Sequence, residues 1–141
     1  MDTFHSLMMG FSVALTPTNL MFAFLGSLFG TIVGILPGLG PAAGTALLIP
    51  LTFHLDPTGA IIMLAAIYYG SQYGGTITSV LMNVPGEAAS AITCLDGYQM
   101  AKQGRAGAAL SIAAIGSFIG GTLATLGLVV AAQPLTRVAL R

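Results

Sequence analysis

The amino-acid sequence predicts an all-α integral membrane protein with about three spanning helices, a re-entrant hairpin rich in glycine and proline, and a broken helix. Composition is the first reason. The 141 residues are 55% hydrophobic and 6% charged, with a mean hydropathy of +0.92, whereas soluble domains carry about 25% charged residues. Charge placement is the second reason. The uncharged stretches 3–55, 57–86 and 106–136 each exceed the roughly 20 apolar residues that a spanning helix needs.

Composition also excludes several functions. The formal net charge is zero and no basic patch is present, so nothing indicates a nucleic-acid partner. The single cysteine, Cys94, can form no disulfide within the chain, and no metal-ligand spacing occurs. The N-terminal sequence MDTFHSLMMG lacks the basic region of a secretory signal, so we expect the first apolar segment to remain as an anchor.

The first spanning helix is predicted at residues 19–36. Glycine recurs at every fourth position from Gly26 through Gly30 and Gly34 to Gly38. This spacing places the glycines on one helix face, the small-xxx-small pattern that lets membrane helices approach closely. We favour tight packing as its role, with a sliding surface as the alternative.

A re-entrant hairpin is predicted next, in the segment GILPGLGPAAGTALLIPLTFHLD. Three prolines, Pro37, Pro41 and Pro50, bracket short apolar pieces, and residues 42–55 are too few to span a bilayer. Glycines near a helix start can present backbone amides to an anion, helped by the positive end of the helix dipole. The alternative is that glycine and proline mark simple kinks.

Asp56-Pro57 predicts the start of the next helix, because aspartate caps helices and proline suits the first helical turn. We favour this structural role of Asp56 over ion binding. The helix is expected to run apolar to about Ile67.

The stretch from Tyr68 to Gly86, YYGSQYGGTITSVLMNVPG, is predicted to be broken at Gly70, Gly74 and Gly75. A break at membrane depth frees backbone groups, which persist only inside protein or beside a watery cavity. Secondary transporters build substrate and ion sites from such breaks, so the pattern indicates transport and part of one half of such a transporter.

A second half-helix is predicted from Thr76 to Val84. Helical spacing places Thr76, Ser79 and Asn83 on one face, which we expect to point toward protein or a cavity. Neutral hydrogen-bonding groups are dense here and suit a carboxylate-bearing ligand or a small cation. These groups are Ser71, Gln72, Thr76, Thr78, Ser79 and Asn83.

A polar loop is predicted at residues 85–106. Within it, DGYQMAKQG could form a short interfacial helix capped by Asp96 and stopped by Gly104. The loop carries the charged residues Glu87, Asp96, Lys102 and Arg105.

The last spanning helix is predicted at residues 107–132. It carries a second small-residue stripe, formed by Ala113, Ser117, Gly121 and Thr125. Gly116 and Gly120 form a GxxxG motif on the same helix. Lys102 and Arg105 precede this helix and Arg137 and Arg141 follow it, so the positive-inside rule gives no orientation.

No catalytic residues are predicted. His54, Asp56 and Glu87 were considered for an intramembrane enzyme, but no base–nucleophile pair is visible. The chain has no nucleophile elbow, Walker sequence or zincin helix, so we expect neither an enzyme nor an ATPase.

With these residues in place, the chain resembles the large membrane subunit, the permease, of tripartite tricarboxylate transporters. The resemblance rests on PGLGP, on YYGSQYGG, and on NVPG followed by DGYQMAKQG, which occur in order. The matching stretches are 34–53, 66–90, 95–110 and 112–122.

The resemblance implies a multi-pass permease of the bacterial inner membrane that takes up tricarboxylates or related carboxylates. It implies coupling to a gradient of Na⁺ or H⁺ with no cofactor, a periplasmic solute-binding protein as partner, and a small membrane subunit. The substrate- or ion-binding residues carried onto this sequence are Pro37, Gly38, Gly40, Pro41, Gly44, Gly74, Gly75, Thr76, Ser79, Asn83, Pro85 and Gly86.

Length is the departure from the family, whose large subunit is several times longer. Residues 1–141 are therefore expected to be the N-terminal part of a permease domain, incomplete for transport alone because midplane sites commonly form between two repeats. The alternative is a small structural membrane protein, or a truncated remnant without transport.

Overall fold

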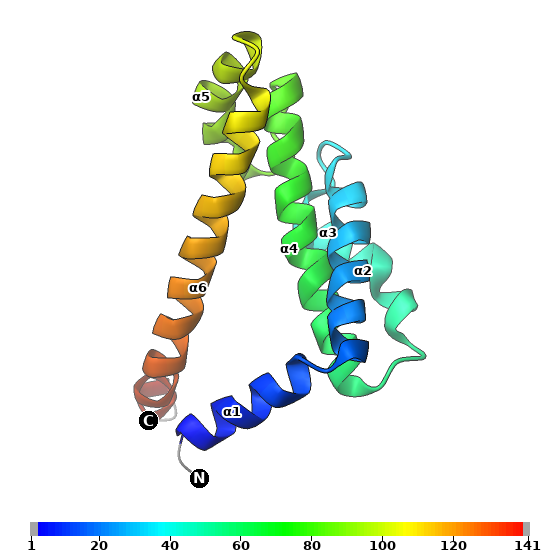
Figure 1. Cartoon of the computed structure of the whole chain (residues 1–141), viewed down its shortest axis with the longest axis vertical. Helices are drawn as coiled ribbons and strands as arrows, with labels where there is room; N and C mark the ends of the chain where they lie inside the picture. Colours follow the sequence, from blue (N-terminus) through cyan, green and yellow to red (C-terminus); the bar gives the residue numbers. More distant parts are fainter. Residues whose placement is uncertain (1–2, 140–141) are drawn as a thin grey trace.

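The computed structural model describes residues 3–139, with side chains described for residues 4–131. Six α-helices and two short 3-10 helices follow one another in these residues, which confirms the all-helical class (Figure 1). They are α1 (Thr3–Ala14), α2 (Pro17–Gly34), α3 (Gly40–Leu48), η1 (Ile49–Thr52), α4 (Pro57–Met82), η2 (Ala88–Ser90), α5 (Ala91–Lys102) and α6 (Ala106–Ala139).

Two of the described helices, α2 and α6 over Ala106–Ala131, are long and apolar enough to cross a membrane. They correspond to the first and last predicted spanning segments. The helix α4 has 26 residues and is about 39 Å long, but it does not belong to this apolar pair. Glycine and hydroxyl side chains replace large apolar ones along it, because much of α4 packs against α2.

The core of the fold is the contact between α2 and α4, and glycine makes it close. A Cβ atom built on Gly26 would lie 2.6 Å from the carbonyl oxygen of Met63, far inside van der Waals contact. The glycines one and two turns later on α2 likewise lie against the α4 backbone. The facing pairs are Gly26 with Met63, Gly30 with Ile67, and Gly34 with Ser71.

Glycines of α4 repeat this arrangement from the other side. A Cβ atom on Gly70 would overlap the carbonyl oxygen of Ser27, and one on Gly74 would overlap that of Thr31. The partners advance in the same direction along both helices, so α2 and α4 run parallel. We call this contact the glycine ladder, formed by Gly26, Gly30 and Gly34 of α2 and by Gly70 and Gly74 of α4.

The predicted break in the fourth helix is wrong. The helix α4 continues without interruption from Pro57 through Gly70, Gly74 and Gly75 to Met82. The glycines are needed for close approach to neighbouring backbone, and α-helical hydrogen bonding continues through them. The predicted second half-helix is therefore the last part of one continuous helix, so no backbone carbonyls are freed at these glycines.

The predicted hairpin contains a short helix. After α2 the chain reverses, and α3 with η1 leads back toward the end of the molecule at which α2 begins (Figure 1). With 9 residues, α3 is about 14 Å long, well short of the roughly 30 Å hydrocarbon core. A re-entrant position in the bilayer stays a prediction.

The Asp56 cap is confirmed. The backbone amide of Gly59 donates to the Asp56 Oδ2 atom at 3.0 Å, and Pro57 is the first residue of α4. The carboxylate therefore has a structural partner at the start of the helix, as the favoured interpretation requires.

The predicted polar loop is mostly helical, because η2 and α5 lie within it. Gly104 follows α5 with φ of +75°, which agrees with its predicted role as a stop. Asp96 is not the cap: α5 begins at Ala91 and Asp96 lies inside the helix. Of the charges expected after the last helix, Arg141 lies outside the described residues, as does the side chain of Arg137.

The helix α6 leaves the rest of the fold at a shallow angle. Near its start, the hydroxyl of Tyr73 on α4 donates to the carbonyl oxygen of Leu110 at 3.3 Å. Beyond that point α6 diverges from α4 (Figure 1). The molecule is thus a tightly joined α2–α4 unit with one long helix standing away from it.

Candidate functional site

The turn before α3 has the geometry of an anion-binding backbone. Gly38 and Gly40 have φ of +86° and +63°, and Leu39 between them has φ of −73°. Alternating backbone signs of this kind point successive amides to one side. No side chain caps α3. Pro41 has no N–H and the Leu39 amide donates to the carbonyl oxygen of Leu36 at 3.4 Å, so the amides left at the positive end of the helix dipole are those of Gly40, Ala42 and Ala43.

A junction of three helices lies beside this turn. The side chain of Ser71 on α4 is 2% exposed and faces α3, where a Cβ on Gly44 would come within 3.0 Å of its Oγ atom. Gly34 of α2 lies over the backbone of the same serine, and Gly74 lies against Gly34. Three glycines therefore bring the backbones of α2, α3 and α4 together around one buried hydroxyl.

Ser71 differs from the other hydroxyl residues of α4. Its Oγ is the one buried side-chain oxygen among the described residues that has no hydrogen-bond partner. Thr78 and Ser79 are also buried but donate to the carbonyl oxygen of Gly75 at 2.9 and 2.8 Å, and Thr76 donates to Gln72 at 3.3 Å. An unpaired buried hydroxyl costs about 1–3 kcal/mol, so Ser71 is the buried hydroxyl of α4 whose presence the packing alone does not explain.

The second predicted site stretch folds back on α4. Gly75 and Gly86 touch: a Cβ on Gly75 would lie 3.4 Å from the Cα of Gly86, and one on Gly86 would overlap the Cα of Gly75. The turn after α4 is therefore held against the helix by two facing glycines. Glu87 then joins the next turn, where its amide donates to Ser90 Oγ at 3.2 Å.

Asn83 does not point into the protein. It is exposed and follows α4 in the left-handed region, with φ of 57°. The expected shared face of Thr76, Ser79 and Asn83 is therefore wrong, because the helix ends at Met82 and Asn83 leaves its register. The hydroxyls of Thr76 and Ser79 are used by their own helix.

The structure thus brings together only part of the predicted site. Gly44, Gly74, Gly75 and Gly86 gather along α4, with Pro41 buried at the start of α3 and Gly40 half-buried beside it. Exposed positions are Pro37, Gly38, Asn83 and Pro85.

Two residues of this junction were not among the predicted site residues. Ser71 was grouped with the neutral polar residues, and Gly34 with the packing stripe. Burial distinguishes Ser71, and burial depends on the partner helix, so the sequence carries no direct signal for it. Among the described residues, no group of three or more histidine, cysteine, aspartate or glutamate side chains could hold a metal ion.

The fold and the comparisons together define a class. Two of the described helices are long and apolar enough to cross a membrane, and the family model that matches residues 20–141 is that of a transporter family, a class distinct from enzymes. The chain belongs to the tripartite tricarboxylate transporter TctA family.

One curated relative matches the entire chain. It is the "Uncharacterized 52.8 kDa protein in TAR-I ttuC' 3'region" of Agrobacterium vitis, which is 55% identical over 141 residues. Those residues are 100% of this chain and 28% of the relative, so the chain spans 28% of that protein's length. No solved structure matches the chain.

Proposed function

We propose that this chain is part of a permease for the uptake of tricarboxylates or related carboxylates, driven by a Na⁺ or H⁺ gradient. The observation that carries the proposal is the family match over residues 20–141. The proposed location is the bacterial inner membrane, with several crossings. The chain spans 28% of its relative, and in this proposal it is part of a longer permease that transports only when complete.

The proposed substrate contact is the start of α3. The backbone amides of Gly40, Ala42 and Ala43 at the start of α3 suit a carboxylate, and the Ser71 hydroxyl lies against the same helix at Gly44 without a partner. A continuous α4 cannot supply unwound carbonyls for a coupling ion, so the chemistry of this half favours the anion.

The proposed partners follow from the tripartite family. A periplasmic solute-binding protein delivers the carboxylate, and a small membrane subunit completes the complex. The alternative of a small structural protein without transport is not favoured by membership of a transporter family.

The test is uptake of radiolabelled citrate and related carboxylates by the complete permease carrying these residues, together with its binding protein and small subunit. We expect Gly40→Ala to reduce uptake at least tenfold, about 1.4 kcal/mol, because alanine is strained at φ of +63° and shifts the amides.

The matched control is Gly104→Ala. Gly104 has φ of +75° and, like Gly40, has no atoms within 4 Å of an added Cβ, but it lies after α5. If Gly40→Ala and Gly104→Ala reduced uptake equally, the turn before α3 would have no specific role in substrate binding. Absence of carboxylate uptake by any complete permease carrying these residues would overturn the function itself.

A further inference from the structure

We propose that the groove enclosed by α1, α4 and α6 is the docking site of a further transmembrane helix, supplied by the part of the permease that lies beyond these 141 residues. The inference goes beyond carboxylate uptake and does not depend on which substrate is moved. It concerns how the rest of the protein completes this portion.

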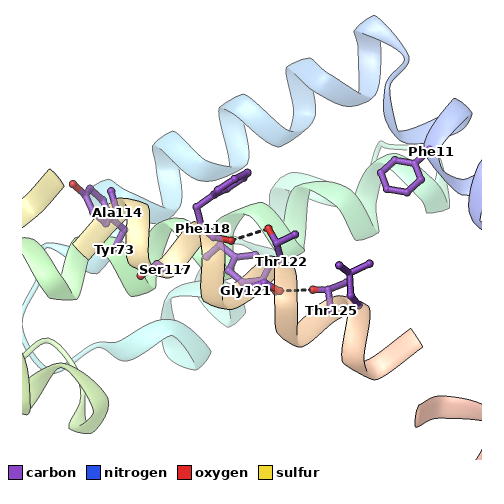
Figure 2. A pocket seen from close by; sticks show the side chains of 10 residues that line it. Phe11, Tyr73, Ala114, Ser117, Phe118, Gly121, Thr122 and Thr125 are labelled. Carbon is purple, nitrogen blue, oxygen red and sulfur yellow. Dashed lines mark hydrogen bonds between the residues drawn. The ribbon is translucent and has the colours of Figure 1, made fainter. Parts of the chain in front are cut away.

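The groove is long, open and apolar. It has a cavity volume of about 650 Å³ and is lined by side chains of three helices, including Phe11 of α1, Tyr69 and Tyr73 of α4, and Phe118 of α6 (Figure 2). Its α6 wall runs from Ala114 to Leu126, a length of about 18 Å. These dimensions fit an elongated apolar occupant.

Large apolar side chains are left uncovered around it. Phe118 is 75% exposed, Tyr69 64% and Phe11 61%. In a membrane protein such a surface faces either lipid or another helix, so both are candidate occupants of the groove.

Three of the five hydroxyl groups that line the groove have hydrogen-bond partners within the chain, and those of Tyr69 and Ser117 have none among the described residues. Thr122 and Thr125 donate to carbonyl oxygens of their own helix, those of Phe118 and Gly121, at 2.7 and 2.8 Å (Figure 2). The Tyr73 hydroxyl is bonded to Leu110. The remaining surface offers mainly van der Waals contact, which is the main attraction between helices in a membrane.

Small residues on the α6 wall indicate a helix rather than lipid tails. Gly121 has no atoms within 4 Å of an added Cβ, and it lies in line with Ser117 and Thr125. Such a strip lets a second backbone approach closely. The same molecule shows this use of glycine in the glycine ladder, where the strip is filled.

The length of the relative indicates which part of the protein would fill the groove. The chain matches that protein over all 141 residues, yet these are 28% of its length. Most of such a permease therefore lies outside the described fold, and an apolar helix from that part fits the groove in shape and chemistry. A second copy of the chain and lipid tails are the competing occupants.

The experiment compares the 141-residue chain with the complete permease that carries it, purified without the small subunit. Native cysteines are removed from both proteins, with Cys94→Ser in the 141-residue part. A single cysteine is then introduced, either in the groove by Ser117→Cys or on another face of α6 by Leu123→Cys. Leu123 is 64% exposed and does not line the groove. Each cysteine carries bimane, and the proteins are reconstituted in vesicles of phosphatidylcholine with brominated acyl chains.

In the 141-residue chain we expect brominated lipid to quench both labels. In the complete permease we expect most of the quenching at Ser117 to be lost, while the label at Leu123 remains quenched. Undiminished quenching at Ser117 in the complete permease would show that lipid fills the groove and would overturn the proposal. A disulfide between two copies through Ser117→Cys in the complete permease would assign the groove to a second copy and would also overturn it.

A second variant does not depend on labelling. Gly121→Leu fills the strip, so we expect it to lower the yield of folded complete permease while leaving the melting temperature of the 141-residue chain unchanged. If Gly121→Leu left both the yield of the complete permease and the melting temperature of the 141-residue chain unchanged, the proposal of a docked helix would be contradicted. Neither readout measures uptake, so a failure of the proposed function and a failure of this inference are distinguishable.

Discussion

The helices α2 and α6 both carry small residues at every fourth position, yet only α2 uses them within the described fold. Gly26, Gly30 and Gly34 lie against the α4 backbone, so a single added carbon would collide at each. On α6, by contrast, Gly116, Gly120 and Gly121 have no atoms near an added carbon. We call the filled contact of α2 with α4 the completed joint. We call the side of α6 that carries Gly116, Gly120 and Gly121, which has no neighbour among the described residues, the free face.

This difference shows that a small-residue pattern indicates the capacity for close packing, while the presence of a partner decides whether packing occurs. The free face of α6 belongs to a chain that spans 28% of its relative, and the completed joint lies wholly inside that portion. Substitutions on the α2 face should therefore lower the stability of the 141-residue chain, and those on the α6 face should leave it unchanged or raise it slightly.

The largest effect is expected from Gly30→Leu. The side chain would displace the backbone of Ile67 and separate α2 from α4, lowering the free energy of unfolding by about 3 kcal/mol or more. Thermal unfolding of the 141-residue chain in detergent micelles, followed by circular dichroism, measures this loss. Gly120→Leu is the control and should melt close to the parent, because nothing lies within 4 Å of its added carbon. Similar losses from both variants would abolish the distinction between the two faces.

Gly70→Ala tests the ladder from its α4 side. The added methyl group would collide with the carbonyl oxygen of Ser27, at an expected cost of about 2 kcal/mol in the same unfolding assay. Combined with Gly30→Ala, the loss should be smaller than the sum, because separation by the first methyl group makes room for the second. Strict additivity would mean that the two glycines do not share one interface.

The limits of sequence prediction are visible in these same glycines. Spacing alone identified the packing face of α2 at Gly26, Gly30 and Gly34. It wrongly continued that face to Gly38, because α2 ends at Gly34 and Gly38 lies in the following turn with φ of +86°. Spacing could not show whether Gly70 and Gly74 break the helix or pack against another helix. The answer depends on α2, which lies parallel to α4 but is distant in sequence. The Asp56 cap was predictable because its bond to Gly59 is local.

The candidate site was predictable to a similar extent. Motif resemblance identified the α3 turn and the Gly75 and Gly86 positions. The importance of Ser71 could not be predicted, because it arises where α2, α3 and α4 meet. Asn83 was misplaced because the helix ends one residue before it.

Ser71→Ala tests whether the buried hydroxyl at the end of the glycine ladder has a partner in the folded chain. Removal of an unpaired buried hydroxyl should leave the free energy of unfolding unchanged or raise it by up to about 1 kcal/mol. Ser79→Ala should instead lower it by about 1 kcal/mol, because that hydroxyl donates to Gly75. Urea unfolding of both variants decides the matter. If Ser71→Ala were as destabilising as Ser79→Ala, the hydroxyl would have a partner in the folded chain.

The smallest effect is expected from Gly127→Ala on the free face. Nothing lies within 4 Å of the added carbon, and alanine is the better helix former, so stability should rise by about 0.5 kcal/mol. The midpoint of thermal unfolding of the 141-residue chain reports this gain. A loss at this position would mean that α6 already has a neighbour there.

The parallel course of α2 and α4 has a consequence for biosynthesis. The glycine ladder cannot close on the ribosome until the chain has been made through Gly74, so α2 must enter the membrane with its glycine face unfilled and wait for α4. We expect a stalled nascent chain ending before Gly70 to leave a cysteine at Ser27→Cys, a half-buried α2 position whose carbonyl oxygen lies against Gly70, open to a bulky thiol reagent. A chain extended well beyond Ser79 should protect it, and equal reactivity at both lengths would show that α2 finds another neighbour during insertion.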